Sequence, residues 1–183
     1  MQQILDHIER RVRPSLRSYL EAEQALTVAL EAGNPDTLDA ARQSVDLAAR
    51  QAVDMLHHLA EFVQHEWTPP FPDVGPVRIA IDAKCEFLRN GKRVADVYLL
   101  RDVSVAFKHH RPRTGRIDVS NDIAPGGFGF GKCRWGEGKY GGVEQIVVAT
   151  NDGDRRALSS ILQNVFDAWM VFLGQPLPPI SQY

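Results

Sequence analysis

The stretch LEAGNPDTL, residues 30–38, lies between two long segments of helical periodicity and decides how they pack. Gly33 suits the position just past a helix end, and Pro35 suits the first turn of the next helix. Apolar residues recur at helical spacing from Gln2 to about Glu31 and again from about Asp36 to Glu66. Two helices of similar length joined by so short a loop are expected to pack antiparallel.

The first of these segments contains Pro14, which lacks an amide proton and therefore kinks a helix or restarts it in a first turn. We expect one bent helix there. After the second segment, the proline-rich residues 67–76, WTPPFPDVGP, predict an irregular crossing. Residues 77–91 then predict a third helix and residues 92–110 a fourth, which must end before Pro112.

The periodicity changes in the C-terminal third of the chain. Residues 115–123 alternate apolar and polar side chains, and residues 142–150 are β-branched and apolar, so both segments predict strands. Residues 154–174 predict a last helix, followed by a proline-rich tail along the surface. The expected fold is therefore mainly α, a helical bundle with two long antiparallel N-terminal helices and a β-hairpin, at about 115–150, inserted before the C-terminal helix.

Length and composition indicate one globular domain that covers residues 1–183. The chain has 183 residues, of which 44% are hydrophobic and 24% charged, and its net charge is only -2. Any binding to nucleic acid must therefore come from a local patch of charge. Cys85 and Cys133 stand far apart, which favours neither a disulfide framework nor a zinc site and fits a cytoplasmic protein. No apolar run is long enough to predict a membrane-spanning helix.

The glycine-rich stretch GGFGFGKC, residues 126–133, nearly matches a phosphate-binding loop of nucleotide-binding proteins. Cys133 stands where that loop has a hydroxyl, and the residues that follow, RWGEGKYGG, are unsuited to the helix it requires. We interpret the stretch as a connection between strands. Its cationic and aromatic side chains include Lys132, Arg134 and Trp135. They suit RNA binding, in which an aromatic ring stacks on unpaired bases and the cations contact the backbone. The alternative is that the aromatic side chains fold back on the core.

The stretch RDVSVAFKHHRPR, residues 101–113, is the strongest indication of a functional site. On a helix, Arg101 and Lys108 lie nearly on one face, as do Asp102 and His109. Between residues 101 and 116 the cations outnumber the single acid, Asp102: they are Arg101, Lys108, Arg111, Arg113 and Arg116. This excess predicts a phosphate-binding patch, and the alternative is a set of cations that favour the helix dipole and form ordinary ion pairs.

The helical segments, together with Arg101, a following polar residue and a downstream histidine, resemble the HEPN superfamily of helical-bundle proteins. The phrase LLRDVSVAFKHH, residues 99–110, also resembles an LRD-x-x-x-A-x-KH stretch of bacterial proteins of similar size. Many HEPN proteins are metal-independent ribonucleases that act as homodimers. The resemblance implies that Arg101, Asp102 and His109 are catalytic. Lys108 would assist, and His110 is an alternative to His109.

A second group of candidate residues lies on the second predicted helix. Asp54, His58, Glu61 and His65 follow one another at spacings of four, three and four, which places them on one stripe. Such stripes bind metal ions in some helical bundles, although a solvated polar face is the commoner explanation and we expect no metal or other cofactor here.

Three functional hypotheses therefore remain open. The first is an RNA-binding or RNA-cleaving HEPN-like homodimer that uses Arg101, Lys108 and His109. The second is a HEPN-like module without catalytic activity that binds a protein partner. The third is a metal-binding bundle that uses the stripe of the second helix. Only the third hypothesis requires the side chains of that stripe to point into the bundle and meet around one ion.

Overall fold

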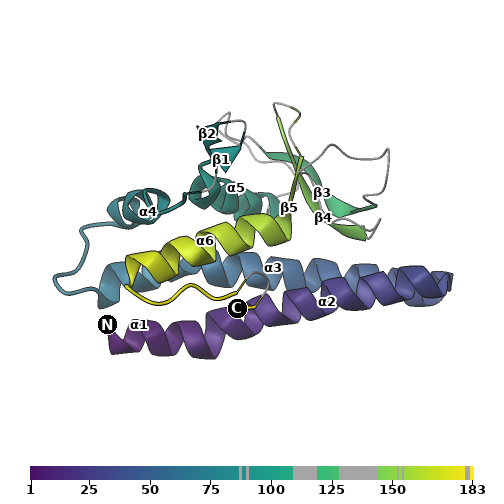
Figure 1. Ribbon diagram of the computed structural model, residues 1–183, viewed down its shortest axis with the longest axis horizontal. Helices are drawn as coiled ribbons and strands as arrows, with labels where there is room; N and C mark the ends of the chain where they lie inside the picture. The colour runs from purple at the N-terminus through teal and green to yellow at the C-terminus, as the bar shows by residue number, and fades with distance from the viewer. Residues whose placement is uncertain are drawn as a thin grey trace.

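The computed structural model describes residues 1–86, 88–89, 91–108, 119–127, 144–151, 153, 155–179 and 182–183. Two long helical segments run side by side along the molecule, and shorter helices and a small sheet cover one side of this pair (Figure 1). The predicted fold class is confirmed: the chain is mainly helical, with the antiparallel helix pair at the N-terminus and a β-hairpin ahead of the last helix.

The first helical segment is continuous but changes its winding before Pro14. It consists of α1 (Gln2–His7), the π-helical turn η1 (Ile8–Val12) and α2 (Arg13–Ala32). The amide of Arg13 donates to the carbonyl of Ile8, one residue further back than in an α-helix. Pro14 then lies at the start of α2, directly after this turn, and has no amide proton to continue the series of helical hydrogen bonds. The single bent helix expected from the sequence is thus present, and the π-turn accommodates the proline.

The turn that decides the fold has the expected geometry. Gly33 ends α2 with φ of 67°, a left-handed conformation that glycine adopts without strain. The side chain of Asn34 accepts hydrogen bonds from the amides of Asp36 and Thr37 and so caps α3 (Pro35–Glu66). α3 is the central helix of the molecule, since it packs against α2, α4, α5 and α6.

The prediction for the third helix was wrong at both ends. α4 (Val74–Asp82) begins inside the proline-rich stretch, because Asp73 caps it and Pro76 falls in its first turn. It ends at Asp82, and a hairpin of β1 (Leu88–Arg89) and β2 (Lys92–Arg93) follows. The sequence Asn90–Gly91 suits a helix end, as predicted above, but it is also a strong hairpin signal, and Gly91 has the positive φ, 73°, that such a turn needs.

The fourth predicted helix is shorter than expected, because β2 occupies its first residues. It is α5 (Asp96–Lys108). The hairpin ahead of the last helix consists of β3 (Val119–Gly127) and β4 (Glu144–Thr150), which pair antiparallel. Gly126 and Gly127, which the sequence predicts in the connection between strands, belong to β3, where Gly126 pairs with Gln145.

A third strand extends this sheet at the expense of the last helix. β5 (Arg155–Ala157) pairs antiparallel with β4, so α6 (Leu158–Phe172) begins later than predicted. The tail also differs from expectation at its end: Tyr183 is 4% exposed, packs edge-on against Phe166, and its carbonyl accepts a hydrogen bond from Arg17.

One cluster of buried hydrophobic side chains draws on β4 and on every α-helix of the described residues. Its largest fully buried members include Tyr19, Leu56, Ile81, Leu100 and Phe166, from five different helices. The helices that carry the candidate site residues, α3, α4 and α5, are therefore fixed to one another through this core. Within the described residues, no helix is both long and apolar enough to cross a membrane.

Candidate functional site

The helix α5 places Arg101 and Asp102 at the edge of the core. Asp102 is buried, and the Nε and Nη2 atoms of Arg101 donate to its Oδ1 atom at 2.9 and 2.7 Å. The guanidinium also lies 5.7 Å from the ring centroid of Tyr98, one turn earlier. Arg101 keeps 35% of its side chain exposed, so one side of it is fixed by the carboxylate and the ring while another side faces solvent.

The last residue of α5, Lys108, reaches across to α3. Its Nζ atom lies 3.4 Å from an oxygen of Asp54 and 3.0 Å from Nε2 of His58. Ser104, one turn earlier on α5, is buried and donates to the same carboxylate oxygen of Asp54 at 2.8 Å. Two residues of α5 thus hold Asp54, and the lysine side chain is oriented toward the imidazole of His58.

A carboxylate stands on the other side of that imidazole. The Nδ1 atom of His58 lies 2.9 Å from an oxygen of Glu61, one turn further along α3. The side chains of His58, Glu61 and Lys108 are 43%, 50% and 44% exposed. A substrate in solution therefore has access to all three, and we call this group, with Asp54, the α3–α5 cluster.

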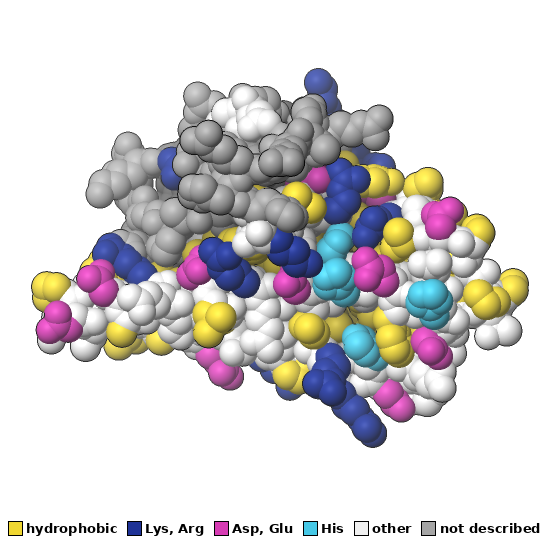
Figure 2. Space-filling model, turned by 180° about the vertical axis from the view of Figure 1, so that it is seen from behind, with side chains coloured by type: hydrophobic (Ala, Val, Ile, Leu, Met, Phe, Trp, Pro, Cys, Tyr) yellow, Lys and Arg dark blue, Asp and Glu magenta, His cyan; other side chains and the backbone are white. Residues whose placement is uncertain are grey.

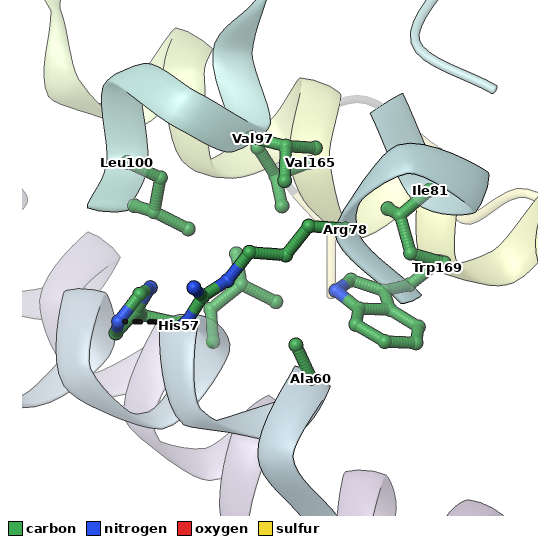
Figure 3. A pocket seen from close by; sticks show the side chains of 9 residues that line it. His57, Ala60, Arg78, Ile81, Val97, Leu100, Val165 and Trp169 are labelled. Carbon is green, nitrogen blue, oxygen red and sulfur yellow. Dashed lines mark hydrogen bonds between the residues drawn. The ribbon is translucent and has the colours of Figure 1, made fainter. Parts of the chain in front are cut away.

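The neighbouring histidine, His57, has a different environment. It lies at the rim of a small apolar pocket between α3, α4, α5 and α6, with its Nε2 atom 3.5 Å from the guanidinium of Arg78 (Figure 3). Burial, the charge of Arg78 and the proximity of His58 lower the pKa of His57 to about 4. His57 is therefore uncharged at neutral pH.

Arg78 of α4 connects this pocket to the exposed cluster. Its guanidinium lies 3.9 Å from a carboxylate oxygen of Glu61. Burial lowers the pKa of Arg78, the charge of Glu61 opposes that effect, and the charge of Arg101 adds to it. Three helices thus contribute cations, carboxylates and histidines to one surface, where Figure 2 shows histidine side chains surrounded by side chains of both charges.

The residues that offer metal ligands in this region are His57, His58 and Glu61, whose ligand atoms lie within 4.8 Å of one another. Two cations already face these atoms, since Lys108 lies at Nε2 of His58 and Arg78 at Nε2 of His57. A divalent ion would have to displace both charges. The two ends of the predicted metal stripe, Asp54 and His65, are not part of this group within the described residues.

The remaining predicted site residues lie outside the part of the chain that the structure describes. They are the catalytic candidates His109 and His110 and the RNA-binding candidates Arg111, Arg113, Arg116, Lys132, Arg134 and Trp135.

Two groups that the sequence analysis had treated as rival sites lie together in the structure. Lys108, from the basic stretch, contacts Asp54 and His58, from the stripe of the second helix. The helical spacing indicated which residues share a face of α3, but nothing in the sequence indicated which helix faces that stripe.

His57, Arg78 and Ser104 were missed by the sequence analysis. Each is a common residue type inside an otherwise ordinary helical segment, and only the packing of α4 and α5 on α3 gives it a polar partner.

Comparison of this chain with protein-family models, with curated proteins and with solved structures gives no match.

Proposed function

We propose that this protein binds RNA at the surface shared by α3, α4 and α5 and cleaves its phosphodiester backbone without a metal ion. One observation carries the proposal: the Lys108 ammonium lies 3.0 Å from the imidazole of His58 on an exposed surface. A cation that attracts a phosphate and an imidazole that moves a proton are the two groups that metal-independent RNA cleavage requires.

The cations of this surface are suited to contact a phosphate. Lys108 and Arg101 are 44% and 35% exposed, and each has a carboxylate neighbour in the free protein. The Lys108–Asp54 pair is exposed on both sides and such pairs contribute about 0–1 kcal/mol, so a phosphate competes for Lys108 at little cost. Arg101 keeps its contact with the buried Asp102 and offers its exposed side to the phosphate. Arg101 has the added advantage that a guanidinium donates two parallel hydrogen bonds to a phosphate.

The resemblance to HEPN proteins supports the same function from the sequence side. It assigns catalytic roles to Arg101 and Asp102, which lie on the helix that also supplies Lys108. It further implies a homodimer, in which two copies of this surface would face one RNA. We include the dimer in the proposal.

The first experiment measures RNA binding by fluorescence anisotropy at several salt concentrations. We expect Lys108→Ala and Arg101→Gln each to weaken binding and to reduce the slope of log affinity against log salt by about one, as the loss of one phosphate contact does. The glutamine amide can still donate a hydrogen bond to the buried Asp102, which protects the fold. Lys92→Ala, an exposed lysine of β2, is the matched control and should bind as the wild type does.

Cleavage of the same RNA in EDTA, with size-exclusion chromatography of the protein alone and with RNA, completes the test. Cleavage in EDTA that both variants reduce supports the proposal. Absence of RNA binding at low salt would overturn it and leave the protein as a helical module that binds some other partner.

A further inference from the structure

We propose that His58, oriented by Glu61, is the acid–base catalyst of this site, and that Lys108 neutralises the phosphate beside it. The inference rests on the proposed function and goes further, because it assigns the proton transfer to α3. The resemblance had assigned it to the histidines after α5.

The hydrogen bonds of His58 fix which nitrogen carries the proton. A carboxylate only accepts hydrogen bonds, so the Nδ1 atom that faces Glu61 at 2.9 Å must be the protonated one. An ammonium only donates, so the Nε2 atom that faces Lys108 at 3.0 Å must carry the lone pair. The free protein therefore holds the imidazole in the one neutral tautomer whose basic nitrogen faces the cation.

This arrangement places the three groups in the order that a general base needs. Glu61 holds the ring in position and compensates the positive charge that forms when Nε2 takes a proton. In the free protein, Lys108 donates to Nε2 of His58. In a complex, the ribose 2′-hydroxyl would take this position and donate to Nε2 instead. When the hydroxyl enters, the ammonium can turn to the adjacent phosphate oxygens, because it is half-exposed and carried on a flexible stem.

The step balances without a cofactor. His58 Nε2 removes the proton of the 2′-hydroxyl, the 2′ oxygen forms a bond to phosphorus, and the bond from phosphorus to the 5′ oxygen breaks. The imidazolium returns its proton, through a water molecule, to the leaving 5′ oxygen. The products are a 2′,3′-cyclic phosphate and a 5′-hydroxyl, and Lys108 stabilises the negative charge on the phosphorane.

His57 is unsuited to this role although it adjoins His58. It is half-buried, its Nε2 atom faces the guanidinium of Arg78, and burial lowers its pKa to about 4, which makes it a weak base. Asp54 is held by Ser104 and Lys108 and serves to orient the lysine. The groups that face His58 are thus Glu61, Lys108 and His57, with Asp54 acting through the lysine.

The test uses the full chain, a short single-stranded RNA and the same sequence with 2′-deoxyribose, all in EDTA. We expect His58→Ala to lower the cleavage rate by about 10²–10⁴-fold, the usual contribution of a general base, with RNA affinity within about threefold of the wild type. The deoxy strand should bind and stay intact. The matched control is Gln51→Ala, an exposed polar residue two turns earlier on α3, which should cleave at the wild-type rate.

Glu61 is a positioning residue, and its test is the pH profile. Glu61→Gln keeps a hydrogen-bond acceptor for Nδ1 but removes the charge, so the rising limb of cleavage rate against pH should move to lower pH and the plateau should fall. A merely structural role for Glu61 would lower the rate without moving the limb. Thermal unfolding of each variant must match that of the wild type.

The outcomes separate this inference from the function on which it rests. If the wild type cleaves and His58→Ala cleaves equally well, the inference fails and the proposed function survives. If the wild type binds RNA without cleaving it in EDTA, the catalytic role of His58 fails and RNA binding survives. If the wild type does not bind RNA, both fail.

Discussion

The two ends of helix α5 both carry a charged pair, and the two pairs have opposite surroundings. At the N-terminal end, Asp96 is fully buried and accepts hydrogen bonds from Arg156 of β5 and from Asn164 of α6, the latter at 2.7 Å. At the C-terminal end, Lys108 is 44% exposed and is shared between Asp54 and His58 of α3. One helix therefore connects a buried pair to an exposed one.

The difference shows where charge stabilises the fold and where it is available for chemistry. Only 6% of the Arg156 side chain is exposed and Asp96 is fully buried, so water does not reach the carboxylate to take the place of the guanidinium. The pair therefore fixes the first turn of α5 to the sheet and to α6. Lys108 exchanges its partners at little cost, because water solvates each group that it leaves. We infer a structural role for the first pair and a functional role for the second.

The strongest test of this contrast is Arg156→Leu. The change leaves the Asp96 carboxylate buried with its arginine lost, which should lower the free energy of unfolding by about 3–5 kcal/mol. Urea denaturation followed by circular dichroism measures the effect. The double variant Asp96→Asn/Arg156→Leu should lose less than the sum of the single variants. A loss below about 1 kcal/mol for Arg156→Leu would show that solvent reaches the pair.

An intermediate effect is expected at Ser104, which lies between the two ends of α5. Its hydroxyl is buried and donates to Asp54 at 2.8 Å. Ser104→Ala should lower the free energy of unfolding by about 1 kcal/mol, since Asp54 keeps its contact with Lys108 and with solvent. If Ser104 also orients Lys108 through Asp54, RNA affinity should fall in the same variant. Unchanged stability and affinity would count against that connection.

The smallest change in stability is expected at the exposed end. Lys108→Gln should change the free energy of unfolding by only about 0–1 kcal/mol, and the difference should shrink as salt is added. Denaturation curves of the wild type and of Lys108→Gln at low and high salt measure this difference in the free energy of unfolding. A loss as large as that of Arg156→Leu would mean that the α3–α5 cluster stabilises the fold, and the functional interpretation of the cluster would lose its basis.

The pH dependence provides a finer test at His57, whose titration has almost no effect on stability at neutral pH because its pKa lies below 7 in the folded and in the unfolded chain. Its pKa is about 4 in the folded protein and near 6.5 when unfolded, so between these values the unfolded chain binds more protons. Stability should therefore fall as the pH drops from about 6.5 to 4. His57→Gln, which does not titrate, should lose less stability than the wild type over that range. Parallel curves for the two proteins would contradict the buried, uncharged state of His57.

Much of the fold could be predicted because its signals are local. The periodicity of residues 2–31 and 36–66, with Gly33 between them, is enough to give the antiparallel pair. The errors lie where a local signal has two meanings. Asn90–Gly91 suits either a helix end or a hairpin. Residues 155–157 form a strand because they pair with β4, and no local pattern in these three residues indicates that pairing.

The sequence by itself determined the mainly helical class, the antiparallel pair and the stripe of polar residues on α3, because helical spacing and turn residues depend only on neighbours along the chain. The tertiary structure alone decided that Lys108 meets Asp54 and His58, that His57 faces Arg78, and that Asp96 is buried with Arg156. These contacts join residues about twenty to sixty positions apart, and they depend on how the helices pack. The candidate site arises from that packing.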